Sequence, residues 1–318
     1  MAAAELRVGE IVSRGSKVRP ARPQGCGQCR TLETKEHPII KTVLITGAAG
    51  SLGTHLRREL AGKYRLRLSD LHPVKNKHKA EQFMQADISR MTDAKRITKG
   101  VDAIVHLGGY PREGPWKTIH DANIAGCYNI FEAAHKNGVK RILFATSNHA
   151  TGFYRRDQII DHRAYPRPDS RYGLSKVFGE MLGSLYCDKY GMEVFLMRIG
   201  NVYPYPQNKR GLSVWSSPRD FAQLVGIGID HPGIRLEVVY GVSGNQRSWY
   251  DNSNAQRLGY RPQDDAETYA TEVLACEEAG DAVAEQYQGG LFVVAETMRP
   301  QVLPAKTVKG VAKKKSSK

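Results

Sequence analysis

The stretch "TVLITGAAGSLGTHL", residues 42 to 56, decides the fold. Its first half is a run of apolar and β-branched residues, which predicts a buried strand, and its second half has the character of an amphipathic helix. Glycines at the junction permit a tight turn and a close approach of a ligand to the backbone, and the free N–H groups that begin the helix suit a pyrophosphate. The stretch therefore predicts a dinucleotide site. The binding residues expected here are Gly47, Gly50, Ser51, Leu52 and Gly53.

The next predicted strand indicates which dinucleotide binds. This strand, "RLRLSD" at 65–70, ends in Asp70, 17 residues after Gly53. A carboxylate at this place accepts hydrogen bonds from both ribose hydroxyls and repels a 2′-phosphate, so we predict NAD as the cofactor. Further cofactor contacts are expected where the third and fourth strands end, at Asp87, Ile88, Leu107, Gly108 and Gly109.

Strands and helices alternate from residue 39 onward, which is typical of βαβ units and predicts an α/β Rossmann fold with a doubly wound parallel sheet. The predicted strands are 39–46, 65–70, a third that ends just before Asp87, 102–109, 140–147 and 193–201, and the predicted helices are 51–61, 124–138 and 173–191. Prolines punctuate the chain beyond residue 203, as expected of a small C-terminal substrate lobe. The expected parts are a flexible basic leader (1–38), an NAD-binding core (39–203), a substrate lobe with C-terminal helices (204–298) and a disordered basic tail (299–318).

Composition indicates an ordinary globular protein, with 318 residues of which 41% are apolar and 25% charged. No run of about 18 apolar residues is long enough for a membrane span, and no apolar signal core begins the chain, so we expect a cytoplasmic protein with no membrane partner. The net charge of +15 lies mostly in the ends: residues 1–38 have seven Lys or Arg against four Glu, and residues 299–318 have seven against no acid. No specific nucleic-acid partner is expected.

The five cysteines do not indicate a metal site. Only Cys26 and Cys29, in "CGQC", are close in sequence, and no second pair of ligands completes the four that structural zinc needs. Cys127, Cys187 and Cys276 are expected to be reduced and mostly packed on helices.

The stretch "RYGLSK", residues 171–176, places Tyr172 one helical turn before Lys176, and Ser147 ends the fifth predicted strand at the same edge of the sheet. A phenol with a pKa of about 10 is a poor base at neutral pH. Lowering that pKa by two or three units takes roughly 3–4 kcal/mol, which a nearby ammonium and a cationic nicotinamide can supply. We therefore predict Tyr172 as the base for a substrate hydroxyl, Ser147 as the residue that holds its oxygen, and Lys176 as the ligand of the nicotinamide ribose.

These motifs, together with "MRIGNVYPY" at 197–205, resemble the extended short-chain dehydrogenase/reductases, the NAD-dependent epimerase/dehydratase family. Within it, "SNHATGFY" at 147–154 and "WYDNSNAQRLGYRPQD" at 249–264 are similar to uronate dehydrogenases, which oxidise C1 of galacturonate or glucuronate with NAD to a lactone. The resemblance implies this activity and a homodimer or higher homo-oligomer. It also implies a cofactor contact at Val202 and sugar contacts at Ser147, Asn148, His149, Asn201 and Arg210, with Arg210 as the partner of the sugar carboxylate.

The identity of the sugar stays open. Uronate dehydrogenases have a serine after "HLGG", where this chain has Tyr110-Pro111-Arg112, and Asn201 replaces a second serine. Pro111-Arg112 instead resembles archaeal short-chain glucose-6-phosphate dehydrogenases, in which case Arg112 is a second anion contact and the substrate is a sugar phosphate.

The same residues bear on two further functions. A nucleotide-sugar epimerase or dehydratase would retain NAD, but "SNHA" lacks the Asp-Glu pair usual in dehydratases. A non-catalytic NAD-binding regulator would be expected to have lost Tyr172 or Lys176, and both remain.

Overall fold

A seven-stranded parallel sheet is the centre of the computed structural model, which describes residues 41–276 and 280–295. The expected leader with Cys26 and Cys29 and the expected basic tail lie outside the described residues. The strand order is β3-β2-β1-β4-β5-β6-β9, and every neighbouring pair is parallel. The strands are β1 (Thr42–Thr46), β2 (Arg65–Asp70), β3 (Gln82–Gln85), β4 (Ala103–His106), β5 (Arg141–Ser147), β6 (Glu193–Ile199) and β9 (Leu236–Gly241). A separate short pair joins β7 (Asn201–Val202) to β8 (Trp215–Ser216).

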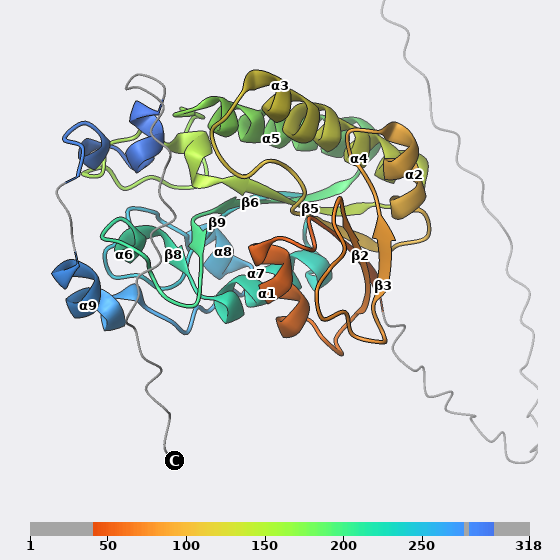
Figure 1. Ribbon diagram of the computed structural model, residues 1–318, viewed down its shortest axis with the longest axis horizontal. Helices are drawn as coiled ribbons and strands as arrows, with labels where there is room; N and C mark the ends of the chain where they lie inside the picture. Colours follow the sequence, from red (N-terminus) through yellow and green to blue (C-terminus); the bar gives the residue numbers. More distant parts are fainter. Residues whose placement is uncertain (1–40, 277–279, 296–318) are drawn as a thin grey trace, which may run out of the picture. The chain divides into compact units, whose positions relative to one another are not determined.

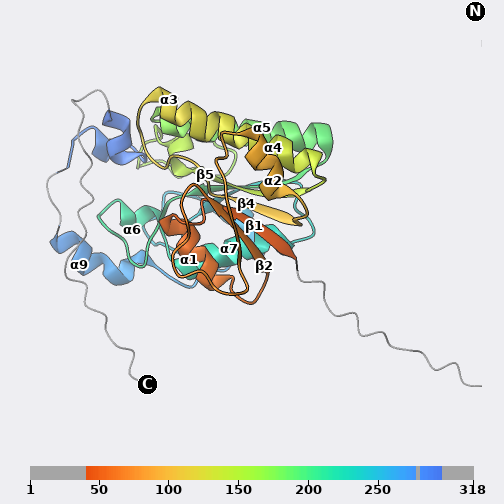
Figure 2. The same cartoon turned by 45° about the vertical axis from the view of Figure 1, so that its right-hand side comes forward.

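Helices cover both faces of this sheet (Figure 1). One layer consists of α2 (Met91–Thr98), α3 (Trp116–Ile119), α4 (Gly126–Lys136) and α5 (Arg171–Tyr190), and the other contains α1 (Ser51–Glu59) and α7 (Pro218–Asp230). Figure 2 shows the same two layers from another side. Val43 and Ile45 pack in the core on the α1 and α7 side, whereas Leu44 packs on the α4 and α5 side. Both faces of β1 are thus buried, which explains its unbroken apolar sequence and confirms the predicted fold class.

The crevice for a ligand follows from the strand order. The direction in which strands are added to the sheet reverses after β3, so β1 lies between β2 on one side and β4 on the other. In open parallel sheets, ligands bind outside the carboxyl ends of the strands at such a switch point. The predicted site residues, which follow β1, β2, β4, β5 and β6, therefore meet at one edge.

The chain beyond residue 203 contributes more regular structure than its prolines indicated. β9 extends the sheet by pairing with β6, and α7 covers it. Pro218 begins α7 rather than interrupting a segment, and the Ser217 side chain caps it by accepting the Asp220 backbone N–H. The division into core and substrate lobe at residue 203 stays a prediction. The remaining short helices are α6 (Gly211–Val214), α8 (Ser253–Arg257) and α9 (Ala270–Ala275), with 3-10 segments at Asn148–Thr151, Ala266–Tyr269, Ala284–Gln286 and Gly290–Val294 and a π-helical turn at His120–Ala125.

The cysteines and the helix lengths can be compared with the sequence-based expectations. Cys127 and Cys187 are buried free thiols on α4 and α5, and Cys276 is an exposed free thiol. In the part of the chain that the structure describes, no helix combines the length and apolar character needed to cross a bilayer.

Candidate active site

The turn after β1 leaves no room for a side chain at Gly47 or at Gly53. Gly47 has φ +68°, and a Cβ on it would lie 2.9 Å from the Gly108 nitrogen. A Cβ on Gly53 would lie 2.6 Å from the Gly47 carbonyl oxygen. The N-cap of α1 is Gly50, which provides no side-chain cap, and the first turn holds no acidic residue. The helix therefore presents its first N–H groups to an anion, and the turn fits a pyrophosphate.

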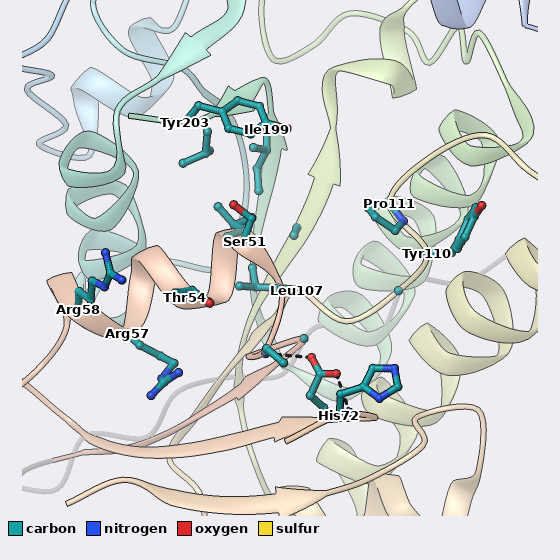
Figure 3. Close-up of a pocket in the computed structure, with 18 of the residues that line it drawn as sticks. Ser51, Thr54, Arg57, Arg58, His72, Leu107, Tyr110, Pro111, Ile199 and Tyr203 are labelled. Atoms are coloured by element: carbon teal, nitrogen blue, oxygen red, sulfur yellow. Dashed lines mark hydrogen bonds between the residues drawn. The ribbon is translucent and has the colours of Figure 1, made fainter. Parts of the chain in front are cut away.

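Asp70 is held beside this turn by both of its carboxylate oxygens. Oδ2 accepts the Ala49 backbone N–H and Oδ1 accepts the His72 backbone N–H, each at 3.0 Å; both bonds are drawn near His72 in Figure 3. A carboxylate oxygen has two acceptor positions, so each oxygen keeps one for a ribose hydroxyl. This geometry suits the role predicted for Asp70.

A single cavity of ≈ 1190 Å³ runs along this edge of the sheet. Its volume exceeds that of an ordinary small-ligand pocket and is large enough for a dinucleotide beside a sugar. Figure 3 shows Ser51, Leu107 and Ile199 on its wall. The predicted residues on the wall are Gly47, Gly50, Ser51, Leu52, Asp70, Leu107, Gly109, Arg112, Ser147, Tyr172, Lys176, Asn201 and Val202.

Four predicted cofactor contacts are not on this wall: Gly53, Asp87, Ile88 and Gly108. The Asp87 Oδ1 atom accepts the backbone N–H and the hydroxyl of Ser89, at 2.9 and 2.7 Å, as in a turn. The Ile88 side chain packs against Gly108 and Gly126. A cofactor role for Asp87 and Ile88 stays a prediction.

Ser147, Tyr172 and Lys176 line the same cavity. The Lys176 ammonium donates to the Ala145 carbonyl at 2.9 Å and lies 5.5 Å from the centre of the Tyr172 ring. Burial lowers the pKa of Lys176 to about 8. Burial also raises the pKa of Tyr172 to about 12, an effect that a hydrogen bond from Ser147 partly offsets. The protein groups alone therefore do not produce the low phenol pKa that the sequence predicted from the Tyr–Lys spacing.

Arg112, Ser147 and Asn201 line the cavity, whereas the other predicted sugar contacts, Asn148, Arg210 and His149, are not among the residues of its wall. His149 contacts two aromatic rings. Its ring stacks on Phe292 at 3.8 Å between centroids and meets Tyr172 edge-on at 5.9 Å. The Arg210 Nε atom donates to the Gln288 carbonyl at 2.7 Å, while the buried Nη2 atom has no hydrogen-bond partner among the described residues. Burial lowers the pKa of Arg210. The Asn148 Nδ2 atom is a second buried donor without a partner in the same part of the structure. Buried donors are nearly always paired, so these two indicate bound water or ligand.

Residues 43–216 match the model of the NAD dependent epimerase/dehydratase family. The chain belongs to this family.

This chain aligns with nearly the whole length of its relatives in the family. The uronate dehydrogenase of Pseudomonas putida is 45% identical over 80% of this chain and 96% of its own. The NAD-dependent glucose-6-phosphate dehydrogenase of Haloferax volcanii is 34% identical over 74% of this chain and 98% of its own. The crystal structure of uronate dehydrogenase from Agrobacterium tumefaciens superposes with a TM-score of 0.77 at 40% identity, covering 80% of this chain and 97% of that one. The family is NAD dependent, and NAD is the cofactor of this chain.

Three further residues contact the predicted site residues, and the sequence analysis did not select them. Phe292 contacts His149, Asp169 binds the same ring, and Glu113 binds the Tyr172 backbone. Asp169 lies directly before the helix that carries Tyr172, and Glu113 follows Arg112, so position along the chain was a weak signal for both. Nothing in the sequence around Phe292 pointed to the site.

Proposed function

We propose that the protein oxidises the C1 hydroxyl of an acidic aldose, a uronate such as galacturonate or glucuronate, to a lactone with NAD as hydride acceptor. One observation carries the proposal: a single cavity is lined both by the phosphate turn with Asp70 and by Ser147, Tyr172 and Lys176. The similarity to uronate dehydrogenases over most of the chain supports the same reaction.

The roles of the chain's own residues follow from their places. Tyr172, as its phenolate, accepts the proton of the substrate hydroxyl, whose oxygen Ser147 holds by a hydrogen bond. When bound, oxidised nicotinamide would supply the hydride acceptor and a positive charge. That charge is needed because burial raises the pKa of Tyr172. Lys176, anchored on the Ala145 carbonyl, has an ammonium group that suits the ribose hydroxyls.

The acidic end of the sugar is assigned to Arg210. Its Nη2 atom is buried and has no hydrogen-bond partner among the residues that the structure describes, so a carboxylate there would complete the hydrogen bonding of the guanidinium. Asn148 Nδ2 is a second donor of the same kind for a sugar oxygen.

A sugar phosphate is the second candidate substrate, because of Arg112. This side chain is exposed and lies on the cavity wall, where it adds a cation that a phosphate would use. The glucose-6-phosphate dehydrogenase relative is consistent with this alternative.

The experiment is a screen for NADH formation, by absorbance, with galacturonate, glucuronate, glucose 6-phosphate and neutral hexoses. Fastest turnover of a uronate supports the first proposal, and fastest turnover of glucose 6-phosphate favours the second. Turnover of none of the acidic sugars contradicts both.

We also propose a homodimer formed through α4 and α5. Leu174, Met181 and Leu185 lie on one exposed face of α5, and Tyr128 is exposed on α4. Light scattering coupled to gel filtration tests this. A dimer that Met181→Glu converts to a monomer supports it, and a monomeric wild type refutes it.

A further inference from the structure

His149 has a buried partner that its proposed role as a sugar contact does not explain. Its Nδ1 atom lies 2.7 Å from Oδ2 of Asp169, whose side chain is completely buried. Asp169 directly precedes Ser170, the N-cap of α5, so the carboxylate lies at the positive end of the helix that carries Tyr172.

The protein holds this carboxylate in one position. The Ser170 hydroxyl donates to Oδ1 at 2.8 Å. A Cβ atom on Gly152 or on Gly289 would collide with Oδ2, so the carboxylate fits between two backbone segments only because both residues are glycines. Asp169 is thereby wedged against the segment after β5 and against the segment that leads to Phe292.

The contact determines which nitrogen of His149 carries a proton. An ionised carboxylate is only an acceptor, so Nδ1 must donate. Nε2 makes no hydrogen bond within the described ranges, and the stacked Phe292 ring holds the plane of the imidazole.

Asp169 also has a cost for catalysis. Its negative charge contributes to raising the pKa of Tyr172, the wrong direction for a base. A carboxylate kept so close to the base is therefore expected to provide a compensating benefit.

We propose that Asp169 is a positioning residue that holds His149 as the Nδ1–H tautomer, so that Nε2 accepts a hydrogen bond from a hydroxyl of the sugar. This inference rests on the proposed function for the identity of the ligand. The tautomer itself is a property of the protein and is testable without substrate.

The first experiment observes the ring nitrogens. In the full-length protein with ¹⁵N-labelled histidine, the His149 signals are assigned by their loss in His149→Gln and followed to a pH at which the ring is neutral. We expect a protonated Nδ1 and an unprotonated Nε2. In Asp169→Asn we expect a shift toward the Nε2–H tautomer, because the amide oxygen keeps the hydrogen bond from the Ser170 hydroxyl and the amide NH2 then faces Nδ1 and donates to it. A neutral wild-type ring protonated on Nε2, or an unchanged ring in Asp169→Asn, overturns the proposal.

The second experiment separates positioning from folding. Asp169→Asn keeps the size of the side chain and should lower kcat/KM for the accepted sugar by roughly tenfold to a hundredfold, with NAD affinity unchanged. In a His149→Gln background the same substitution should add little further loss, because its effect acts through the ring. Asp157→Asn, at an exposed site, is the matched control. An equal loss in both backgrounds would mean that Asp169 only supports the fold.

The two experiments also distinguish this inference from the proposed function. If no acidic sugar is oxidised, the proposed function fails, while the nitrogen signals still decide the role of Asp169 in setting the tautomer.

Discussion

The Glu113 carboxylate accepts the backbone N–H of Tyr172 at 2.9 Å, although 59 residues separate the two in sequence. Glu113 follows Arg112 in the loop after β4, and Tyr172 lies in the first turn of α5. The backbone of Tyr110 in the same loop is bound twice by the Asn123 side chain, at 2.6 and 3.0 Å. The loop on the cavity wall is therefore hydrogen-bonded to the start of the helix that carries the predicted base.

Glu113→Ala is predicted to lower kcat/KM for the accepted sugar by roughly tenfold, which is the loss of about 1–2 kcal/mol expected for one such hydrogen bond. KM should rise as the loop loosens, and kcat should fall as Tyr172 moves. Glu113→Gln is the control, because its amide oxygen still accepts the Tyr172 N–H. Steady-state kinetics measures kcat and KM for the variants. Unchanged values in Glu113→Ala would show that the contact does not position the base.

Tyr172→Phe is predicted to abolish NADH production and to leave NAD binding within about threefold, because it removes the base and little cofactor contact. Turnover and NAD titration of the same preparation check this. Activity above roughly a few per cent of wild type would exclude Tyr172 as the base.

Asp70→Ala is predicted to narrow the preference for NAD over NADP by roughly 1–3 kcal/mol, through loss of the ribose hydrogen bonds and of the repulsion of the 2′-phosphate. The ratio of kcat/KM for the two cofactors measures this. Asp70→Asn retains an acceptor without the charge, so it separates the two causes. A wild-type enzyme that prefers NADP would be incompatible with this role.

Arg210→Ala is predicted to cost about 2–4 kcal/mol in kcat/KM for the acidic sugar, mostly through KM if the contact is equally strong in the ground and transition states. Any neutral hexose that is turned over should be almost unaffected. Equal effects on charged and neutral sugars would show that Arg210 supports the fold instead.

The Arg112→Ala variant completes this comparison between substrates. With a phosphorylated sugar it should add a loss comparable to that of Arg210→Ala, because the phosphate uses a second cation. With a uronate it should matter little, since one guanidinium satisfies one carboxylate.

Lys176 is predicted to make stability depend on pH. Its pKa is lowered from 10.5 to about 8, so between these values the unfolded chain binds more protons and the free energy of unfolding should rise with pH. Below about pH 8 both states are protonated, and the full penalty of about 3 kcal/mol remains. Lys176→Met should lack this rise, and at neutral pH it should be more stable than wild type by about 2 kcal/mol after loss of the bond to Ala145. Denaturant unfolding at neutral and alkaline pH tests this, and parallel pH profiles of the two proteins would contradict it.

Local features of this chain could be predicted from its sequence. The run before Gly47 forms β1, "RLRLSD" forms β2, and the Tyr172–Lys176 spacing lies within one helix. These features depend on neighbouring residues: apolar periodicity, the φ of +68° that a glycine tolerates at position 47, and one helical turn between side chains. The parallel order then brings the strand ends to one edge, so most of the residues that the sequence predicted for the cofactor lie on the cavity wall.

Only the tertiary structure decided what surrounds the reacting groups. Phe292 on His149, Glu113 on the Tyr172 backbone and the return of β9 to the sheet all join segments that are distant in sequence. The same holds for the pKa of Tyr172, which the spacing to Lys176 led us to expect low and which burial raises. Side-chain packing and desolvation depend on every segment that closes over a residue, and a local pattern does not specify those segments.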